Sequence, residues 1–209
     1  MKKCKLSEQR YQHQYNTIKN IMKSIGIECS IYIYESDQYT GKAGHFGIAL
    51  TTATIQDYNT HPYVLRFFAA HELIHYKHKE YGYWRALKAT LCVLLLIVGL
   101  KYPFRRLNAR ILLSELRASI EGSVASDLSP EELFLSQDVA QRRNNDSIRP
   151  KSYQVGYPDR EMIKEYATRY VRMDKEIAAR ILDDYCAALG IQRPQAFKEK
   201  VISAFFKGN

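Results

Sequence analysis

Apolar residues recur at intervals of three and four along several stretches of the chain, a spacing that places them on one face of a helix. The first stretch is residues 7–25, whose apolar positions are Tyr11, Tyr15, Ile18, Met22 and Ile25. Gly26 follows directly and predicts the helix end, because glycine adopts the left-handed conformation of a C-cap at little cost. Further helices are predicted over residues 61–82 and 107–126.

Two stretches between the first two helices are instead rich in β-branched and aromatic residues, which predicts strands. They are residues 29–35 and 46–54, and the segment Gly41 to Gly44 between them predicts a turn. A few strands followed by a long helical remainder indicate an α+β fold. We expect a small antiparallel or mixed sheet packed on a helix, and a mostly helical C-terminal half.

The C-terminal half shows mainly helical patterns. A capping serine, a first-turn proline and two glutamates open residues 129–143 and predict a helix there. Residues 144–158 are polar and irregular, and residues 159–206 predict two or three more helices. We therefore divide the chain into a domain of residues 1–143 and an extension of residues 144–209 that packs on it.

The helix predicted over residues 61–82 contains the pattern H-E-x-x-H, formed by His71, Glu72 and His75. Residues four apart lie on one face of a helix, so the two imidazoles can bind one Zn²⁺ at about 2.0–2.1 Å. Zinc lowers the pKa of a bound water to about 7, and a neighbouring carboxylate can then accept its proton. The spacing predicts His71 and His75 as metal ligands and Glu72 as a general base.

The alternative is a surface helix in which the histidines are incidental. A chance match to this motif has odds of about one in a hundred for a chain of this length and composition. The surrounding residues favour the metal helix. Thr60 is a candidate cap and Pro62 suits a first turn, and apolar positions lead into the motif at Val64, Leu65, Phe68 and Leu73.

A catalytic zinc needs a third protein ligand and an open position for water. Glu115 is the candidate, because it belongs to the separate helix predicted over residues 107–126. Ala118, Ser119 and Gly122 fall on the same helical face and would let that helix approach the metal helix closely. The alternative for Glu115 is an exposed glutamate on a helix surface.

The net charge of +9 indicates an anionic partner, either nucleic acid or a phospholipid surface. Many of the basic residues flank one apolar run, and no nucleic-acid-binding motif is present, so nucleic acid is an unlikely partner by this argument. A solvated basic face is an equal alternative to the membrane surface. Cys4, Cys29, Cys92 and Cys186 form no C-x-x-C pair, and there is no secretory signal; both favour reduced thiols and the cytoplasm.

The apolar run is Ala89 to Leu100, within a longer segment at 86–113 that we expect to form an apolar helix or hairpin. As a helix the run would be about 18 Å long, which is short of a hydrocarbon core of about 30 Å. It is therefore a buried core helix, a re-entrant or interfacial hairpin that turns near Lys101 to Phe104, or half of a two-pass hairpin. The third alternative is costly because Arg105, Arg106 and Arg110 follow.

The motif, the segment Lys77-His78-Lys79-Glu80, the apolar run, the Tyr102–Phe104 element and the Glu-x-x-Ala sequence at Glu115 resemble membrane-associated gluzincin metallopeptidases. The likeness is to the zinc domains of β-lactam sensor-transducers and to heat-shock-type and CAAX prenyl proteases. The resemblance implies a zincin-like fold with Glu115 as the third zinc ligand. It also implies an outer partner for a ligand histidine at Ser119, where the family usually has aspartate; a hydroxyl holds an imidazole less firmly.

Because His75 and Glu115 would bind one zinc, both must lie on the same side of any membrane, which excludes a single crossing between them. We expect a cytoplasmic protein, peripheral or re-entrant at the inner membrane face. The predicted function is a zinc-dependent endopeptidase acting on a protein or peptide substrate. One alternative is a non-catalytic, zinc-stabilised regulatory or partner-binding domain, and another is a basic nucleic-acid-binding protein with an accidental motif.

Two further expectations concern the substrate. A strand beside a metal helix can pair with an extended peptide, and Gly47–Thr52 is the candidate edge; an ordinary sheet strand is the alternative. A tetrahedral oxyanion needs a hydrogen-bond donor, for which Tyr153 and Tyr157 are candidates. His45, which has no ligand-like spacing to the motif, is expected to be a surface residue.

Overall fold

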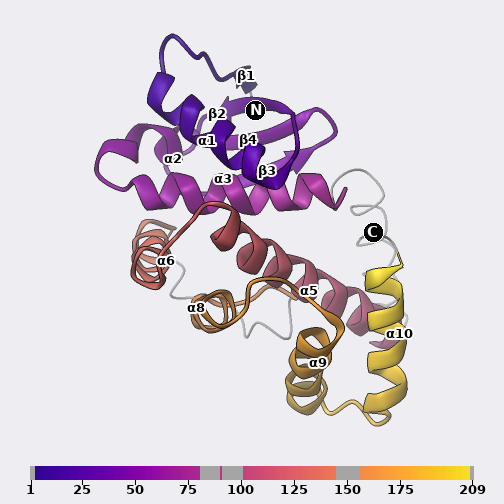
Figure 1. Ribbon diagram of the computed structural model, residues 1–209. Coiled ribbons are helices and arrows are strands. Elements are labelled where there is room, and N and C mark those ends of the chain that lie inside the picture. Colours follow the sequence, from indigo (N-terminus) through magenta and orange to yellow (C-terminus); the bar gives the residue numbers. More distant parts are fainter. Residues whose placement is uncertain (1–2, 81–89, 91–100, 145–155, 208–209) are drawn as a thin grey trace.

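The computed structural model describes residues 3–80, 90, 101–144 and 156–207, which form an α+β fold (Figure 1). Four strands make one sheet: β1 (Lys3–Lys5), β2 (Ser30–Tyr34), β3 (Gly41–Gly44) and β4 (Gly47–Thr51). Their order across the sheet is β1-β2-β4-β3. β2 and β4 are parallel, with Ser30 opposite Gly47, and the other two pairs are antiparallel. The sheet is therefore small and mixed, in agreement with one of the two predicted arrangements.

Two predictions about this sheet are wrong. The segment Gly41–Gly44 is the strand β3 and not a turn. Gly47–Thr52 is not an edge, because β4 lies between β2 and β3, and all five residues of β4 are buried. The strand predicted to continue to Thr54 ends at Thr51, whose side chain accepts a hydrogen bond from the backbone N–H of Thr54 and so caps the short helix α2 (Thr52–Gln56).

The first helix, α1 (Gln12–Ile25), begins five residues later than predicted, because Tyr11 has a non-helical backbone conformation. Its buried residues are Ile18, Ile21, Met22 and Ile25, and Gly26 ends it in the left-handed conformation, as the sequence predicted. The turn η1 (Asp57–Asn59) then leads to α3. Thr60 does not cap α3: its hydroxyl donates to the Asp57 carbonyl at 3.0 Å, and His61 occupies the N-cap position.

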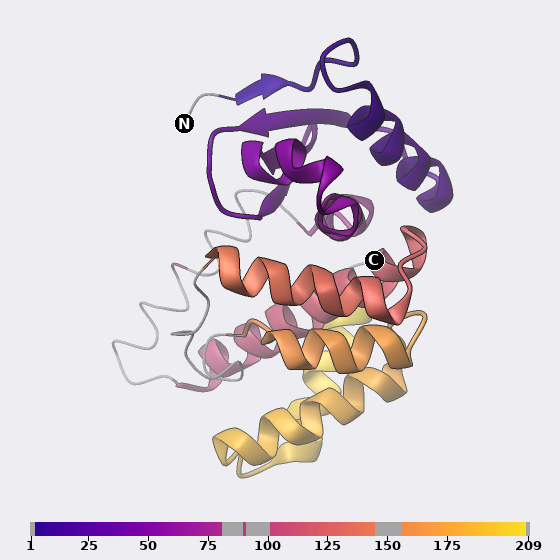
Figure 2. The same ribbon diagram turned by 90° about the vertical axis from the view of Figure 1, so that its left-hand side faces the viewer.

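α3 (Pro62–Lys77) lies in the middle of the molecule, between the sheet with α1 on one side and the C-terminal helices on the other (Figures 1 and 2). Its residues from Val64 to Leu65 and from Phe67 to Ala70 are all buried, as are Glu72 to His75. A helix that is apolar on most of its circumference is one that is packed on several sides. The H-E-x-x-H motif therefore sits in the interior layer of the fold.

α5 (Lys101–Ala125) begins six residues before the predicted helix, and residues Lys101 to Phe104 form its first turn. Lys101 to Phe104 are helical, so the turn of a hairpin does not lie within them; a turn before Lys101 would fall outside the described residues. Within the apolar run Ala89 to Leu100, Thr90 belongs to the described residues and the other positions lie outside them. Of the helices in the described ranges, none combines the length and the apolar character that a membrane crossing requires.

Of the remaining helices, α8 (Arg160–Arg169), α9 (Lys175–Leu189) and α10 (Pro194–Phe206) pack against α5, whereas α6 (Pro130–Asn144) packs against α3 and α8 (Figures 1 and 2). α6 follows its predicted range within one residue. α8, α9 and α10 are three helices where two or three were expected. α5 packs directly on α3, and the predicted site residues lie on these two helices.

Candidate metal centre

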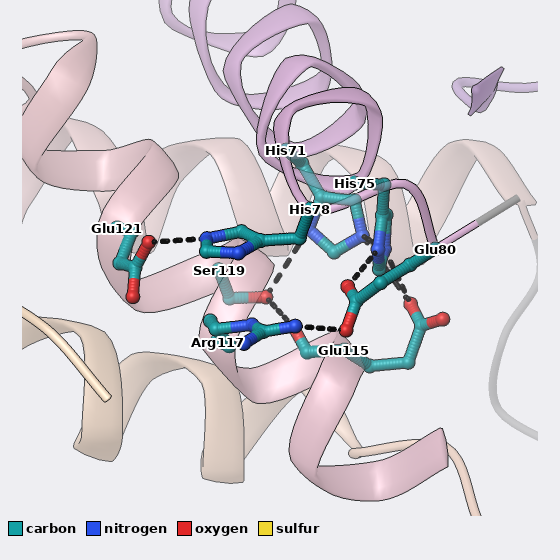
Figure 3. Close-up of polar contacts among 8 residues, drawn as sticks. All are labelled: His71, His75, His78, Glu80, Glu115, Arg117, Ser119 and Glu121. Carbon is teal, nitrogen blue, oxygen red and sulfur yellow. Dashed lines mark hydrogen bonds and ion pairs between the residues drawn. The ribbon is translucent and has the colours of Figure 1, made fainter. Parts of the chain in front are cut away.

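His71 and His75 project from consecutive turns of α3 toward α5, and Glu115 of α5 meets them (Figure 3). Nε2 of His71 lies 3.1 Å from Nε2 of His75 and 3.3 Å from Oε2 of Glu115. Nε2 of His75 lies 3.5 Å from the same Glu115 oxygen. The structure thus brings together three ligand atoms from two helices that are separated by more than twenty residues of chain.

This triangle has the dimensions of a metal site. A tetrahedral ion with ligands at about 2.0–2.1 Å has ligand-to-ligand separations of about 3.3–3.4 Å. The three observed separations of 3.1, 3.3 and 3.5 Å bracket that value. His71, His75 and Glu115 are also the group in the described residues whose donor atoms lie close enough together to share a cation. These three side chains can therefore hold a metal ion.

Each imidazole has an oxygen partner on its other nitrogen, which orients Nε2 toward the centre of the triangle. Nδ1 of His71 lies 3.3 Å from Oγ of Ser119. That hydroxyl donates its own hydrogen to the Glu115 carbonyl at 2.9 Å, so it is free to accept from His71. Protonation at Nδ1 leaves the lone pair of Nε2 for a cation, which is the arrangement of metal-binding histidines.

The partner of His75 is Glu80, a residue that sequence reasoning did not assign to the site. Nδ1 of His75 lies 3.0 Å from Oε2 of Glu80, and the guanidinium of Arg117 donates to the other oxygen, Oε1. The only signal in the sequence was the acidic residue after the basic stretch, five positions beyond His75. Five residues do not separate same-face positions on a helix, so periodicity could not identify Glu80.

The carboxyl groups of Glu72, Glu80 and Glu115 all lie near the two imidazoles, and Arg117 donates to Glu80. A buried excess of negative charge is unfavourable unless a cation neutralises it.

The pKa values of His75, Glu115 and Glu80 show how these charged groups affect one another when no ion is bound. Burial acts to lower the pKa of His75, but Glu115 and Glu80 outweigh it and raise the value to about 10. Burial acts to raise the pKa of Glu115, yet the two histidines hold it well below its usual range. For Glu80, His75 and Arg117 likewise overcome burial and lower the pKa to about 2. All three shifts favour positive charge at the position of the imidazoles.

Glu72 follows His71 directly and is turned about 100° from it around the axis of α3, toward the edge strand β3. Burial raises its pKa, while the histidines and a hydrogen bond from the Ala43 backbone act in the opposite direction. Gly41 makes room for it: a Cβ at this position would lie 2.6 Å from Cγ of Glu72. The glycine that suggested a turn is explained by this close approach of a side chain to the strand.

Gly122 allows the second close approach. A Cβ there would lie 3.0 Å from the backbone N of His71 and 3.2 Å from the carbonyl carbon of Ala70. The sequence argument that small residues near Glu115 permit close contact with the metal helix agrees with this geometry. Only glycine brings α5 near enough for Glu115 to meet both imidazoles without displacement of backbone atoms.

The other candidate residues lie elsewhere. Glu121 contacts His78 at 3.2 Å and not the triangle. His45 is exposed, as predicted. Tyr157 is 47% exposed, and Tyr153 lies outside the described residues, so neither has a demonstrated role as an oxyanion donor. Comparisons with protein-family models, curated proteins and solved structures gave no match to this chain.

Proposed function

We propose that this protein is a zinc-dependent endopeptidase of the gluzincin type. The observation that supports the proposal most directly is the triangle of His71, His75 and Glu115, whose dimensions suit three corners of a tetrahedron. Two imidazoles and one carboxylate are a ligand set that suits zinc and leaves a fourth position for water.

The chain's own residues supply the remaining chemistry. Bound zinc would act as a Lewis acid toward the peptide carbonyl and would lower the pKa of a water molecule at the fourth position. Glu72 accepts a proton from the attacking water and returns it to the departing amine, which is general base and then general acid catalysis. Burial of Glu72 keeps this proton transfer away from bulk solvent.

The substrate backbone aligns along β3 in this proposal. In the described part of the chain β3 pairs with β4 alone, so β3 is an edge strand of the sheet. An extended peptide can add to such an edge as a further strand. Glu72 packs against β3, because a Cβ at Gly41 would lie 2.6 Å from its Cγ, so a peptide at this edge would lie near the general base.

Metal analysis tests the ligand set. Purified protein should contain about one zinc per chain, and His71→Ala should contain almost none. Zinc retained at the wild-type level in His71→Ala would show that the metal binds elsewhere. Absence of zinc from both proteins after loading with the ion would favour a basic protein with an accidental motif.

Replacement of Glu72 by Gln tests catalysis separately. With a quenched fluorescent peptide library as substrate, Glu72→Gln should lose activity by at least about 10²–10⁴-fold and keep its zinc. Equal cleavage by the two proteins would contradict the role of Glu72. No cleavage by zinc-loaded wild-type protein would favour a zinc-stabilised regulatory or partner-binding domain.

Methylation of single backbone amides in a cleaved peptide tests the strand-pairing part. Loss of cleavage should alternate along the peptide with a period of two, because alternate residues of a strand face its partner. A uniform effect at every amide would argue against alignment along β3.

A further inference from the structure

The chain reverses direction directly after α3, and the reversal returns Glu80 to the metal helix. Lys79 has a left-handed backbone with φ of 52°. The N–H of Lys79 donates to the Tyr76 carbonyl at 3.1 Å, and the N–H of Glu80 donates to the His75 carbonyl at 2.9 Å. This pair of bonds is a Schellman motif, which terminates the helix and satisfies its last carbonyl groups.

Glu80 is consequently bound twice to the same residue. Its N–H bonds the carbonyl of His75, and its carboxylate accepts from Nδ1 of His75 at 3.0 Å. The helix end and the imidazole are therefore fixed by one residue. A non-glycine residue in the left-handed conformation is uncommon and is retained where the surroundings determine it.

Arg117 fixes the other side of the Glu80 carboxylate. Its side chain is 3% exposed, and it donates to Oε1 of Glu80. A guanidinium this deeply buried needs a compensating anion, because an isolated buried charge is strongly unfavourable. The pair holds the carboxylate in one orientation, with one oxygen toward Arg117 and the other toward His75 (Figure 3).

Phe205 of the C-terminal helix α10 completes the chain of contacts. The guanidinium carbon of Arg117 lies 4.3 Å from the centre of the Phe205 ring, and Phe205 itself is 5% exposed. A guanidinium over an aromatic face at this distance is a cation–π contact, which is stronger when both groups are removed from water. α10 thus supports Arg117 from the side opposite the metal centre.

We infer that Glu80, Arg117 and Phe205 act as positioning residues that set the orientation of His75 for metal binding, and that α10 is thereby required for full zinc affinity. The inference rests on the proposed zinc site. It assigns a role in the metal centre to a helix that contributes no ligand. In the described residues, the partner of Nδ1 of His71 is the neutral hydroxyl of Ser119, whereas the partner of Nδ1 of His75 is the carboxylate of Glu80.

Zinc affinity of the full-length protein, measured by competition with a chromophoric chelator, tests the chain of contacts. Glu80→Gln should lower affinity by about 10–100-fold, the usual effect of losing an outer partner of a ligand. If Glu80→Gln does not fold, Glu80→Asp replaces it in this test, because aspartate keeps the negative charge that Arg117 needs. The shorter side chain of Glu80→Asp should lower zinc affinity by about tenfold.

Phe205→Leu keeps apolar bulk and removes the ring face, and should lower affinity by about three- to tenfold. Phe205→Tyr keeps the aromatic ring and should retain the zinc affinity of the wild type. The matched control is Phe197→Leu, a buried residue of α10 that stacks on Tyr185 and not on Arg117. It should destabilise the packing of α10 and leave zinc affinity within about twofold of wild type.

A double-variant cycle separates a positioning role from general stability. If Phe205 acts through Arg117, Phe205→Leu should have little further effect in an Arg117→Lys background, because lysine cannot reproduce the flat guanidinium stack. The visible spectrum of the Co²⁺-substituted protein adds a direct readout. Phe205→Leu should change the ligand-field bands, and Phe197→Leu should not.

Each outcome has a distinct meaning. Wild-type affinity in Phe205→Leu and Glu80→Asp, or equal losses in Phe205→Leu and Phe197→Leu, would overturn this inference and leave the proposed peptidase intact. If the zinc affinities of the variants change as expected but the wild-type protein has no peptidase activity, the inference is supported and the proposed catalysis is contradicted. A wild-type protein that binds no zinc would overturn both.

Discussion

At the scale of single residues, the site depends on positions where a side chain is missing or short. Gly41 leaves the space that Cγ of Glu72 occupies, and Ser119 provides a hydroxyl where a carboxylate would bring another buried charge. The site already has three carboxylates and one guanidinium around two imidazoles. A hydroxyl orients His71 without adding to that negative charge.

Gly41→Ala is expected to reduce peptide hydrolysis with little effect on zinc binding. The new Cβ would lie 2.6 Å from Cγ of Glu72 and would push the carboxylate out of place. A displacement of about 1 Å in a catalytic group can cost about 10²-fold in rate, so we expect a loss of about 10–100-fold in kcat/KM. Steady-state kinetics and zinc titration measure the two effects separately.

The matched control is Gly44→Ala in the same strand. Its Cβ would meet only the Gly47 carbonyl oxygen, at an ordinary contact distance of 3.7 Å. Similar activity in the two variants would mean that the space at Gly41 does not determine the position of Glu72.

At the scale of secondary-structure elements, the function depends on how closely α5 approaches α3. α3 supplies both histidines and α5 supplies Glu115, so the separation of the two helix axes sets the size of the ligand triangle. Gly122 fixes the closest point, and α6 is attached to α3 nearby through Arg66 and Glu132. Changes at either contact should alter the site without touching a ligand.

Gly122→Ala is expected to weaken zinc binding by about tenfold. Alanine favours the helix by about 1 kcal/mol, and crowding a packed interface costs about 1–3 kcal/mol, so we expect a net loss of folding free energy of about 0–2 kcal/mol. The backbone of His71, only 3.0 Å from the new Cβ, must move, and Glu115 then moves away from the imidazoles.

Zinc competition and urea unfolding of the metal-free protein measure these two effects. Val124→Ala on the same helix, at a side chain 51% exposed, is the control. Wild-type zinc affinity in Gly122→Ala would show that the close approach is not needed for the site.

Glu132 gives an element-scale prediction that depends on pH. It accepts from the Ser129 N–H at 3.1 Å and from Arg66 at 2.8 Å. Burial acts to raise its pKa, but these hydrogen bonds outweigh burial and lower it from the ordinary value of 4.5. A carboxyl whose pKa is lower in the folded state stabilises the fold above its unfolded pKa and loses that contribution as pH falls.

Glu132→Gln should therefore lower the free energy of unfolding by about 0.5–1 kcal/mol at pH 7, a small value because solvent screens the pair. The difference from wild type should stay constant down to about pH 5 and shrink as pH falls further, through the lowered pKa. Urea unfolding at a series of pH values measures it. Glu131→Gln, an exposed residue of the same first turn, should show no comparable difference; equal effects would contradict a specific Arg66 contact.

At the scale of the whole molecule, the candidate metal centre lies between two parts of the fold. The sheet and α1 pack on one side of α3, and α5 with α8, α9 and α10 forms the other side (Figure 1). A cation bound by ligands from α3 and α5 would connect these parts directly. Its binding energy would then contribute to folding, because the ligands come together only in the folded chain.

Removal of zinc is accordingly expected to lower the melting temperature. At free zinc about 1,000 times Kd, binding adds about 4.1 kcal/mol of stability. For a chain of this size that corresponds to about 8–16 °C. Thermal unfolding with zinc and with a chelator measures the shift. His71→Ala should melt at one temperature in both conditions, and a zinc-dependent shift of wild-type size in that variant would contradict the ligand set.

Local patterns predicted much of the fold. The stripe of α1, the Gly26 helix end and the opening of α6 depend on neighbours a few residues apart, and those interactions are the same in any context. The errors fall where tertiary contacts override local preference. Gly41 is part of a strand because Glu72 packs against it, and β4 is central because β3 folds back beside it.

The sequence by itself determined that His71 and His75 would lie on one helical face, since helix geometry alone places residues four apart together. It also placed Glu115, Ser119 and Gly122 on one face of a second helix. Only the tertiary structure decided that the two faces meet, and that Glu80, Arg117 and Phe205 support His75. The longest-range of those contacts, between Arg117 and Phe205, joins residues 88 positions apart, and chain packing, not local periodicity, selects such pairs.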